Sequence, residues 1–241
     1  MTVTAAVVPA AGRGERLGPG APKAMRLIGG VPMLVHAVRA LATARSVDLV
    51  VVAAPEDGVA EVVALLAEHN LLDAGPGVAP AMVVSGGETR QDSVARALVS
   101  LPVEVDVVLV HDAARPLVPS SLIDAVAAAV RAGAPAVVPG LPVADTVKQV
   151  DADGTVLATL DRSALRAIQT PQGFARAVLT AAHAASDPDA PATDDAGMVE
   201  AQGVPVLVVP GDEEAFKVTR PIDLVLAEAV LARRRAAGVV N

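Results

Sequence analysis

Short β-branched runs alternate along this chain with longer stretches rich in alanine and leucine, and this alternation restricts the fold more than any other feature. The β-branched runs are continuously apolar, which is typical of strands covered on both faces of a sheet. The predicted strands are Val3–Val8, Leu49–Ala53, Met82–Val84, Val105–Val110, Ala136–Val138 and Val204–Val209. The predicted helices are Pro32–Ala44, Gly58–Glu68, Gln91–Leu101, Ser120–Ala132, Phe174–Ala185 and Pro221–Arg235. The pattern indicates an α/β fold, with a single Rossmann-like, mostly parallel sheet and helices on both faces.

Residues 141–170 interrupt this alternation. Asp145–Val150 and Thr155–Leu160 flank an Asp-Ala-Asp-Gly sequence, in which Gly154 supplies the positive φ that a hairpin turn requires. Because an isolated two-stranded ribbon is only marginally stable in water, the hairpin needs a neighbour to pack on. We therefore expect residues 1–241 to form a single domain, from which 141–170 protrudes as an inserted β-arm that dimerises the protein.

The composition excludes several classes of protein. The chain has no cysteine, which rules out disulfides, thiolate nucleophiles and zinc ribbons. Phe174 and Phe216 are its only aromatic residues and its net charge is −8, both of which argue against a nucleic-acid partner. No stretch reaches the ~18 apolar residues of a membrane span, and the apolar start lacks the basic region of a signal peptide. We expect a cytoplasmic protein with no membrane partner.

A glycine-rich, basic segment, Pro9–Lys23, directly follows the first predicted strand. In an open α/β sheet this position lies at the carboxyl edge, where ligands bind, and glycines let backbone N–H groups approach phosphate oxygens. Residues 1–26 carry a local charge of +3 in this acidic chain. The dinucleotide-binding fingerprint fails because Leu17 stands where glycine is required, and the Walker A pattern fails at Lys23–Ala24. The segment is either an anion site of another kind or a solvated glycine loop.

This loop and several later blocks form an ordered set of motifs. Pro-Ala-Ala-Gly-x-Gly-x-Arg-Leu, followed by Pro-Lys, resembles the signature of nucleotidyltransferases that condense a nucleoside triphosphate with a phosphorylated acceptor. The later blocks are Gly86–Val94, His111–Pro116, Asp145–Lys148, Gln169–Phe174, Thr193–Ala196 and Lys217–Pro221. With them the chain resembles the 2-C-methyl-D-erythritol 4-phosphate cytidylyltransferase family of the non-mevalonate isoprenoid pathway, and the resemblance implies a nucleotide-diphospho-sugar transferase-like fold.

The resemblance implies transfer of a cytidylyl group from CTP to a sugar-alcohol phosphate, 2-C-methyl-D-erythritol 4-phosphate, with release of pyrophosphate. Such a displacement needs alignment and neutralisation of charge more than covalent help from the protein. By resemblance, Arg16 and Lys23 are catalytic and stabilise the transition state. A guanidinium can grip two phosphate oxygens, while an ammonium acts as a point charge. The substrate-binding backbone of the loop is expected to comprise Ala10, Ala11, Gly12 and Gly14.

Gly87 and Ser93 come after the predicted strand Met82–Val84, at the same sheet edge. The resemblance places cytosine here, with the glycine backbone close to the ring and Ser93 bonded to its polar edge. Thr89 and Asp92 belong to the same segment, and capping of the following helix explains these two polar side chains equally well.

A further polar group, Asp112, Ala113 and Arg115, comes after the predicted strand Val105–Val110. Asp112 can accept hydrogen bonds from hydroxyl groups of the sugar-alcohol phosphate or hold a magnesium-bound water, and Arg115 can reach a phosphate. A structural ion pair between Asp112 and Arg115 explains the same pattern, so both alternatives stay open. His111 is expected to be a structural histidine at the strand end, with its ring nitrogens hydrogen-bonded, and not a catalytic base.

The remaining assignments depend on the resemblance alone. It makes Arg162 and Lys217 catalytic cations that position the acceptor, with Thr146 and Thr170 as hydrogen-bond donors to it. Thr146, Arg162 and Thr170 flank the predicted arm, so an arm that crosses a two-fold axis would place some of them in the neighbouring subunit's site.

Magnesium is the expected cofactor, because the oxygens of a triphosphate need neutralising, and it would be held largely by the substrate phosphates. No metal-binding spacing occurs among the four histidines, and no protein ligand is assigned. Two alternatives to the function remain: a ribitol-5-phosphate cytidylyltransferase with the same loop chemistry, and a non-catalytic nucleotide-binding regulator. The sequence motif His-Asp-Ala-Ala-Arg-Pro favours methylerythritol phosphate over ribitol phosphate as the acceptor. The failed glycine spacing disfavours a nicotinamide-dependent oxidoreductase.

Overall fold

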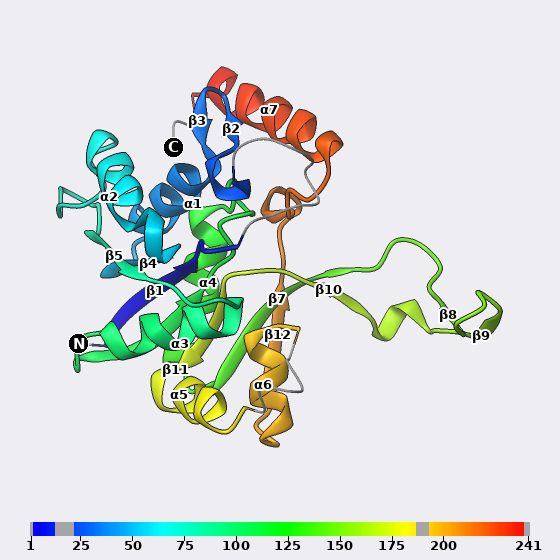
Figure 1. The fold of residues 1–241 in the computed structure, drawn as a ribbon. Helices are drawn as coiled ribbons and strands as arrows, with labels where there is room; N and C mark the ends of the chain where they lie inside the picture. The colour runs from blue at the N-terminus through cyan, green and yellow to red at the C-terminus, as the bar shows by residue number, and fades with distance from the viewer. Residues whose placement is uncertain (1, 13–21, 187–192, 239–241) are drawn as a thin grey trace.

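The computed structural model describes residues 2–12, 22–186 and 193–238, and an eight-stranded sheet forms its centre (Figure 1). The strands of this sheet are β1 (Val3–Pro9), β4 (Leu49–Ala54), β5 (Ala81–Ser85), β6 (Val105–Val110), β7 (Ala136–Pro142), β10 (Arg166–Ile168), β11 (Gln172–Ala175) and β12 (Val206–Pro210). They lie in the order β10-β7-β11-β6-β1-β4-β5, and β12 pairs with β7. All six strands predicted from the sequence are present, with their ends shifted by a few residues.

The centre of the sheet is parallel. β1 pairs with β4 and β6 in the parallel sense, as β4 does with β5 and β12 with β7. β11 is antiparallel to both β6 and β7, and β10 is antiparallel to β7. The predicted mostly parallel sheet is confirmed, and the antiparallel pairs are confined to the half that contains β7.

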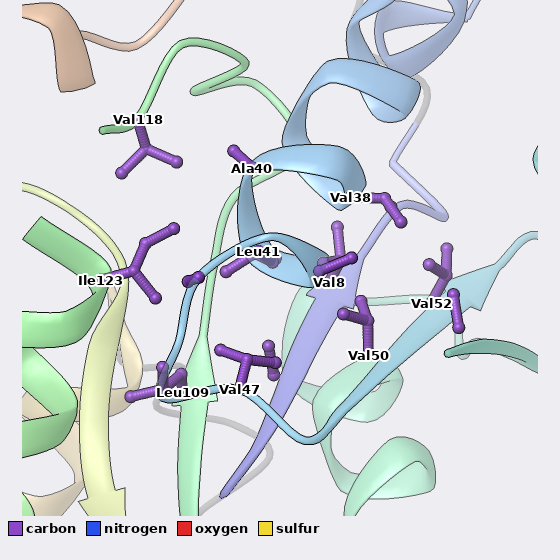
Figure 2. Close-up of a cluster of buried hydrophobic side chains, with 14 of the residues drawn as sticks. Val8, Val38, Ala40, Leu41, Val47, Val50, Val52, Leu109, Val118 and Ile123 are labelled. Carbon is purple, nitrogen blue, oxygen red and sulfur yellow. The ribbon is translucent and has the colours of Figure 1, made fainter. Parts of the chain in front are cut away.

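Helices cover both faces of the sheet, as predicted. The helices are α1 (Met33–Ala42), α2 (Val59–Glu68), α3 (Arg90–Ser100), α4 (Ser120–Arg131), α5 (Arg176–Ala184), α6 (Asp195–Ala201) and α7 (Pro221–Ala236). On one face, Val8 and Val52 pack with α1, α2 and α4; Figure 2 shows Leu41 of α1 and Ile123 of α4 in this cluster. On the other face, Val7 packs with α3, α5 and α6. Successive strand residues therefore enter opposite layers, which explains the continuous apolar runs.

A smaller core joins α7 to the start of the chain. Ile28 belongs to the short hairpin of β2 (Leu27–Ile28) and β3 (Val31–Pro32), and it packs with Leu117 and with Leu231 of α7. Figure 1 shows α7 beside this hairpin. Val218, in the segment just before α7, belongs to the same core.

The helix predicted over Phe174–Ala185 is wrong at its start, because Phe174 belongs to strand β11 and the helix begins at Arg176. β11 is wedged between two strands: Gly173 pairs with Leu109 of β6 and with Val137 of β7. A Cβ on Gly173 would lie 2.6 Å from Val126 Cγ1 of α4, so glycine is what permits the close packing of this helix. Tertiary pairing, which local sequence does not encode, decides the structure here.

The predicted hairpin at 145–160 is confirmed. β8 (Lys148–Val150) pairs antiparallel with β9 (Val156–Thr159), and Gly154 in the turn has a φ of +84°. These two strands form a sheet of their own, which Figure 1 shows set apart from the central sheet beyond β10. Val150, Val156 and Leu157 of the hairpin are all at least half exposed. Its role in dimerisation stays a prediction.

Within the three described ranges, no helix combines the length and the hydropathy that crossing a bilayer requires.

Candidate active site

The segments that follow β1, β5 and β6 meet at one edge of the sheet, because these strands point the same way. A cavity of about 240 Å³ opens there. Its lining comprises Pro9, Ala10, Ala11 and Gly12 after β1, Glu88, Thr89, Arg90 and Ser93 around the start of α3, Asp112, Ala113 and Ala114 after β6, and Lys23, Ala24 and Lys217. We refer to it as the Asp112 cavity. The glycine loop, the strand-end carboxylate and a lysine from the far end of the chain thus share one space.

Asp112 contacts two cations of this cavity. Lys217 Nζ lies 2.7 Å from Asp112 Oδ2, and Arg90 Nε lies 3.3 Å from Asp112 Oδ1. Burial by itself raises the pKa of Asp112, but the charges of Arg90 and Lys217 hold that pKa well below its usual range. The carboxylate is therefore ionised at neutral pH, and each of its oxygens already faces a cation.

Backbone hydrogen bonds bring Lys217 to Asp112. Val218 N donates to Ala114 O at 2.8 Å, which ties the segment before α7 to the loop after β6. Asp223, in the first turn of α7, accepts from Thr219 N at 2.7 Å and fixes where the helix begins. Lys217 consequently leaves this segment at a defined place beside Asp112.

Arg115 supports the same segment, and its contact with a substrate phosphate stays a prediction. Its guanidinium donates to Ala215 O at 2.7 Å and to Ile168 O at 3.3 Å, and the residue is buried. It does not line the Asp112 cavity. The structural ion pair raised as the alternative is present at the limit of contact, with Arg115 Nε 4.0 Å from Asp112 Oδ2. The same side chain joins the loop before Lys217 to the end of β10.

Thr170 also lies behind the site. Thr170 Oγ1 accepts from Asp112 N at 3.1 Å and lies 3.0 Å from His111 Nδ1, while His111 Nε2 lies 3.1 Å from Arg115 O. Burial lowers the pKa of His111 to about 4, so its ring is neutral at physiological pH. Thr170 thus orients the backbone of Asp112 and does not line the Asp112 cavity, and its hydrogen bond to the acceptor stays a prediction.

A second, neighbouring cavity of about 750 Å³ shares Ala11, Gly12 and Glu88 with the Asp112 cavity. Gly86 and Gly87 line it, and neither has room for a side chain. A Cβ on Gly87 would lie 2.2 Å from Asp92 Cβ. The glycine pair therefore presents bare backbone to this second cavity.

The side chains at the start of α3 show the helix capping that the sequence left open, while the contact of Ser93 with cytosine stays a prediction. Ser93 Oγ accepts from Gly87 N at 3.1 Å and donates to Thr89 O at 2.9 Å, and Ser93 lines the Asp112 cavity. Thr89 and Asp92 form a capping box at the start of α3. Helix capping is thus confirmed for Thr89 and Asp92, while Ser93 holds the glycine pair in place.

The structure brings most of the predicted residues together. Those that line the Asp112 cavity are Ala10, Ala11, Gly12, Lys23, Ser93, Asp112, Ala113 and Lys217. Gly87 lines the neighbouring cavity. Gly14 and Arg16 lie outside the described residues.

Thr146 and Arg162 lie on the segment that carries the hairpin. Both are exposed, and Arg162 donates to the carbonyl of Ala144 in the same segment. Neither lines the Asp112 cavity of this chain. Their predicted contact with the acceptor stays a prediction.

Sequence reasoning gave Arg90 no role, although the residue stands inside one of the quoted motif blocks. It is the first residue of α3 and lines the Asp112 cavity. A signal was present: a cation directly after a capping threonine faces the positive end of the helix dipole, which is unfavourable without a nearby anion.

The described residues contain no group of three or more histidine, aspartate or glutamate side chains placed to hold a metal ion. Asp112 and Glu88 are the carboxylates of the Asp112 cavity. A metal here would need most of its ligands from the substrate.

Comparisons with known proteins show which family the chain belongs to. The family model of 2-C-methyl-D-erythritol 4-phosphate cytidylyltransferase matches residues 4–233. A Streptomyces coelicolor protein of that description is 63% identical over 96% of this chain and 86% of its own length. A Nocardia farcinica protein is 52% identical over 96% of this chain and 95% of its own length. The crystal structure of the cytidylyltransferase from Thermus thermophilus has a TM-score of 0.73 and 39% identity, covering 97% of this chain and 100% of that one.

Proposed function

This chain belongs to the 2-C-methyl-D-erythritol 4-phosphate cytidylyltransferase family and is a nucleotidyltransferase; we propose that the Asp112 cavity is where it carries out its reaction. It transfers a cytidylyl group from CTP to 2-C-methyl-D-erythritol 4-phosphate and forms 4-diphosphocytidyl-2-C-methyl-D-erythritol. The observation that carries the placement is that Lys23, Asp112 and Lys217 line one cavity at the carboxyl ends of β1 and β6.

The chemistry explains why cations dominate such a site. A phosphate oxygen of the acceptor attacks the α-phosphorus of CTP, the bond from that phosphorus to the bridging oxygen breaks, and pyrophosphate leaves with the electron pair. Negative charge grows on the leaving group and around the phosphorus, and positive groups aimed there stabilise the transition state. A phosphate monoester is already ionised near neutral pH, so the acceptor needs no protein base.

We assign the triphosphate to the glycine-loop side of the Asp112 cavity. Ala10, Ala11 and Gly12 offer backbone there, and Lys23 supplies an ammonium to the same cavity. Arg16 belongs to the same loop by sequence, and its place beside the α-phosphate is a prediction. The cytosine ring would then lie over the bare backbone of Gly87 in the neighbouring cavity.

We assign the acceptor to the part of the same cavity that Asp112 and Lys217 line. The Asp112 carboxylate can accept hydrogen bonds from hydroxyl groups, and the Lys217 ammonium beside it can contact the acceptor phosphate. The phosphate of the acceptor would thus lie between Lys217 and Lys23. Lys217 would be on the side of the attacking oxygen, and Lys23 on the side of the triphosphate.

Magnesium fits this arrangement as a cofactor held by the substrate. Both oxygens of Asp112 face cations, so direct coordination to that carboxylate would displace Arg90 or Lys217. The ion would take its ligands mainly from the triphosphate and water, with Asp112 or Glu88 within reach of a metal-bound water. When bound, magnesium neutralises charge on the phosphate oxygens.

We further propose a homodimer formed through the segment that carries β8 and β9. Its exposed Val150, Val156 and Leu157 offer apolar surface for a partner, and a lone two-stranded ribbon gains stability by packing. In such a dimer Thr146 and Arg162 would act at the neighbouring subunit's acceptor site.

Pyrophosphate release tests the proposal. The purified protein should consume CTP with magnesium and 2-C-methyl-D-erythritol 4-phosphate, and turn over ribitol 5-phosphate poorly. Faster turnover with ribitol 5-phosphate would assign the acceptor pocket to the other sugar alcohol. Binding of CTP without turnover of either acceptor would favour a regulator.

A further inference from the structure

Arg90 occupies an unusual place for a cation. It is the first residue of α3, where the backbone N–H groups make the helix end positive. The capping box of Thr89 and Asp92 already completes this helix end, so local structure gives no reason for an arginine. Its side chain is one-third exposed and lines the Asp112 cavity.

Two carboxylates account for Arg90. Its Nε lies 3.3 Å from Asp112 Oδ1, and its Nη1 lies 2.7 Å from Asp195 Oδ2. One guanidinium therefore connects a carboxylate of the cavity with a second carboxylate behind it. A planar guanidinium presents several N–H groups in a fixed plane, which suits it to two partners at once.

Asp195 fixes Arg90 from the protein interior. Asp195 is the first residue of α6 and is fully buried. Its Oδ1 lies 3.0 Å from Nε2 of His183 on α5, whose side chain is 5% exposed. Burying a carboxylate is costly unless polar groups surround it. Asp195 meets this need with an ion-pair contact to Arg90 through Oδ2 and a hydrogen bond with His183 through Oδ1.

The position of Arg90 decides how Asp112 is presented to the cavity. With Oδ1 of Asp112 facing Arg90, Oδ2 faces Lys217 Nζ at 2.7 Å. Arg115 Nε, at 4.0 Å from Oδ2, and the buried ring of His111 complete the charged and titratable surroundings. Rotation of the Asp112 carboxylate would break both close contacts, so Arg90 holds the acceptor side of the cavity in one arrangement.

We propose that Arg90 is a positioning residue for cytidylyl transfer: anchored by Asp195 and His183, it orients the Asp112 carboxylate and, through it, the Lys217 ammonium. This inference rests on the proposed function of the Asp112 cavity. It assigns Arg90 no contact with substrate. Its effect on the reaction passes through Asp112.

The direction of two pKa values agrees with this role. Burial opposes the charged form of Arg90, but Asp195 and Asp112 raise its pKa above the usual value. Arg90 in turn contributes to the low pKa of Asp112. The two groups thus keep each other charged.

A double-mutant cycle tests whether Arg90 acts through Asp112. The variants are Arg90→Gln, Asp112→Asn and the double substitution, and the measured quantity is kcat/KM for the acceptor at saturating CTP. We expect Arg90→Gln to lower it by about tenfold to 100-fold, as for loss of a hydrogen-bonded charge. In the Asp112→Asn background the same substitution should lower kcat/KM by less than about threefold, because the carboxylate that Arg90 orients is gone.

Two results would overturn the proposal. Equal losses in both backgrounds would mean that Arg90 acts on the substrate independently of Asp112. No loss in the wild-type background would mean that Asp112 is oriented without it. Absence of turnover in the unmodified protein would instead refute the proposed function itself, so the two failures are distinguishable.

Arg131→Gln is the matched control. Arg131 has the same side-chain exposure as Arg90, 33%, and likewise faces an aspartate, Asp48, away from the cavity. We expect this control to lose stability while leaving the kcat/KM of each background, wild type or Asp112→Asn, unchanged. A loss of kcat/KM in Arg131→Gln similar to that in Arg90→Gln would mean that general destabilisation, and not positioning, explains the effect.

If Arg90→Gln does not fold, Arg90→Lys and Asp195→Asn replace it in the cycle. Lysine keeps the charge but not the planar fork, and asparagine weakens the anchor while Arg90 remains. Both variants should lower kcat/KM less than Arg90→Gln would, and both effects should again shrink in the Asp112→Asn background. Effects of equal size in the two backgrounds would count against the proposal.

Discussion

The ammonium of Lys217 lies 2.7 Å from Oδ2 of Asp112, so the segment before the last helix completes a cavity that begins at the first strand. Arg115 and the bond from Val218 N to Ala114 O hold that segment against the loop after β6. Lys23 lines the same cavity. The site is thus assembled from three distant parts of the chain, and its two lysines face a common space.

Replacing Lys23 should remove catalysis without removing the fold. We expect Lys23→Ala to lower kcat by ~100-fold or more, by analogy with losing one oriented group that stabilises transition-state charge. Steady-state kinetics with thermal unfolding checks this, and the exposed Arg45→Ala serves as a control for loss of a surface cation. Near-normal turnover in Lys23→Ala would remove Lys23 from the reaction centre.

Arg162→Ala should mainly impair use of the acceptor. We expect a higher KM for 2-C-methyl-D-erythritol 4-phosphate with the KM for CTP nearly unchanged, because Arg162 lies on the arm and not at the cavity of its own chain. A rise confined to the KM for CTP would contradict our placement of the two substrates.

Mixing subunits tests whether the arm serves its neighbour. Arg162→Ala and Lys217→Ala proteins, each impaired alone, should regain activity after denaturation and refolding together. In a mixed dimer one site would then combine the intact Lys217 of one subunit with the intact Arg162 of the other. No gain on mixing, with mixed dimers present, would mean that both residues act within one chain.

Gly87→Ala should weaken CTP binding. An added Cβ would meet Asp92 Cβ at 2.2 Å, so the glycine pair and the start of α3 must shift. We expect the dissociation constant for CTP, measured by calorimetry, to rise by about tenfold or more. Gly75→Ala is the control, since its Cβ would make an ordinary 3.9 Å contact with Val78. Unchanged CTP affinity in Gly87→Ala would argue against a base site beside this backbone.

His111 should make the protein less stable in mild acid. Its ring is buried and its pKa falls to about 4 in the folded protein, while the unfolded chain binds a proton near pH 6.5. Between these values only the unfolded state is protonated, so stability falls as the pH drops from about 6.5 to 4, by about 3 kcal/mol at most. Urea unfolding should show this slope in the wild type and a weaker one in His111→Gln. Parallel pH profiles for the two proteins would contradict it.

Much of the fold could be predicted because the apolar composition of runs such as Val105–Val110 indicates buried strands. β11 could not, since Gln172–Ala175 has no β-branched run and becomes a strand only between β6 and β7. For the site, the sequence correctly grouped Asp112 with Lys217 and Lys23. It could not show that Arg115 and Thr170 bind neighbouring backbone and do not line the cavity, or that Arg90 joins two carboxylates, because such facts depend on side-chain direction in the assembled structure.

The most direct measurement is a crystal structure of the protein with CTP and magnesium. We predict the triphosphate in the Asp112 cavity, with Lys23 Nζ within hydrogen-bond distance of a phosphate oxygen, the α-phosphorus open toward Lys217, and the cytosine ring over Gly87. A triphosphate bound outside that cavity, or inside it with Lys23 directed away from every phosphate oxygen, would contradict the account.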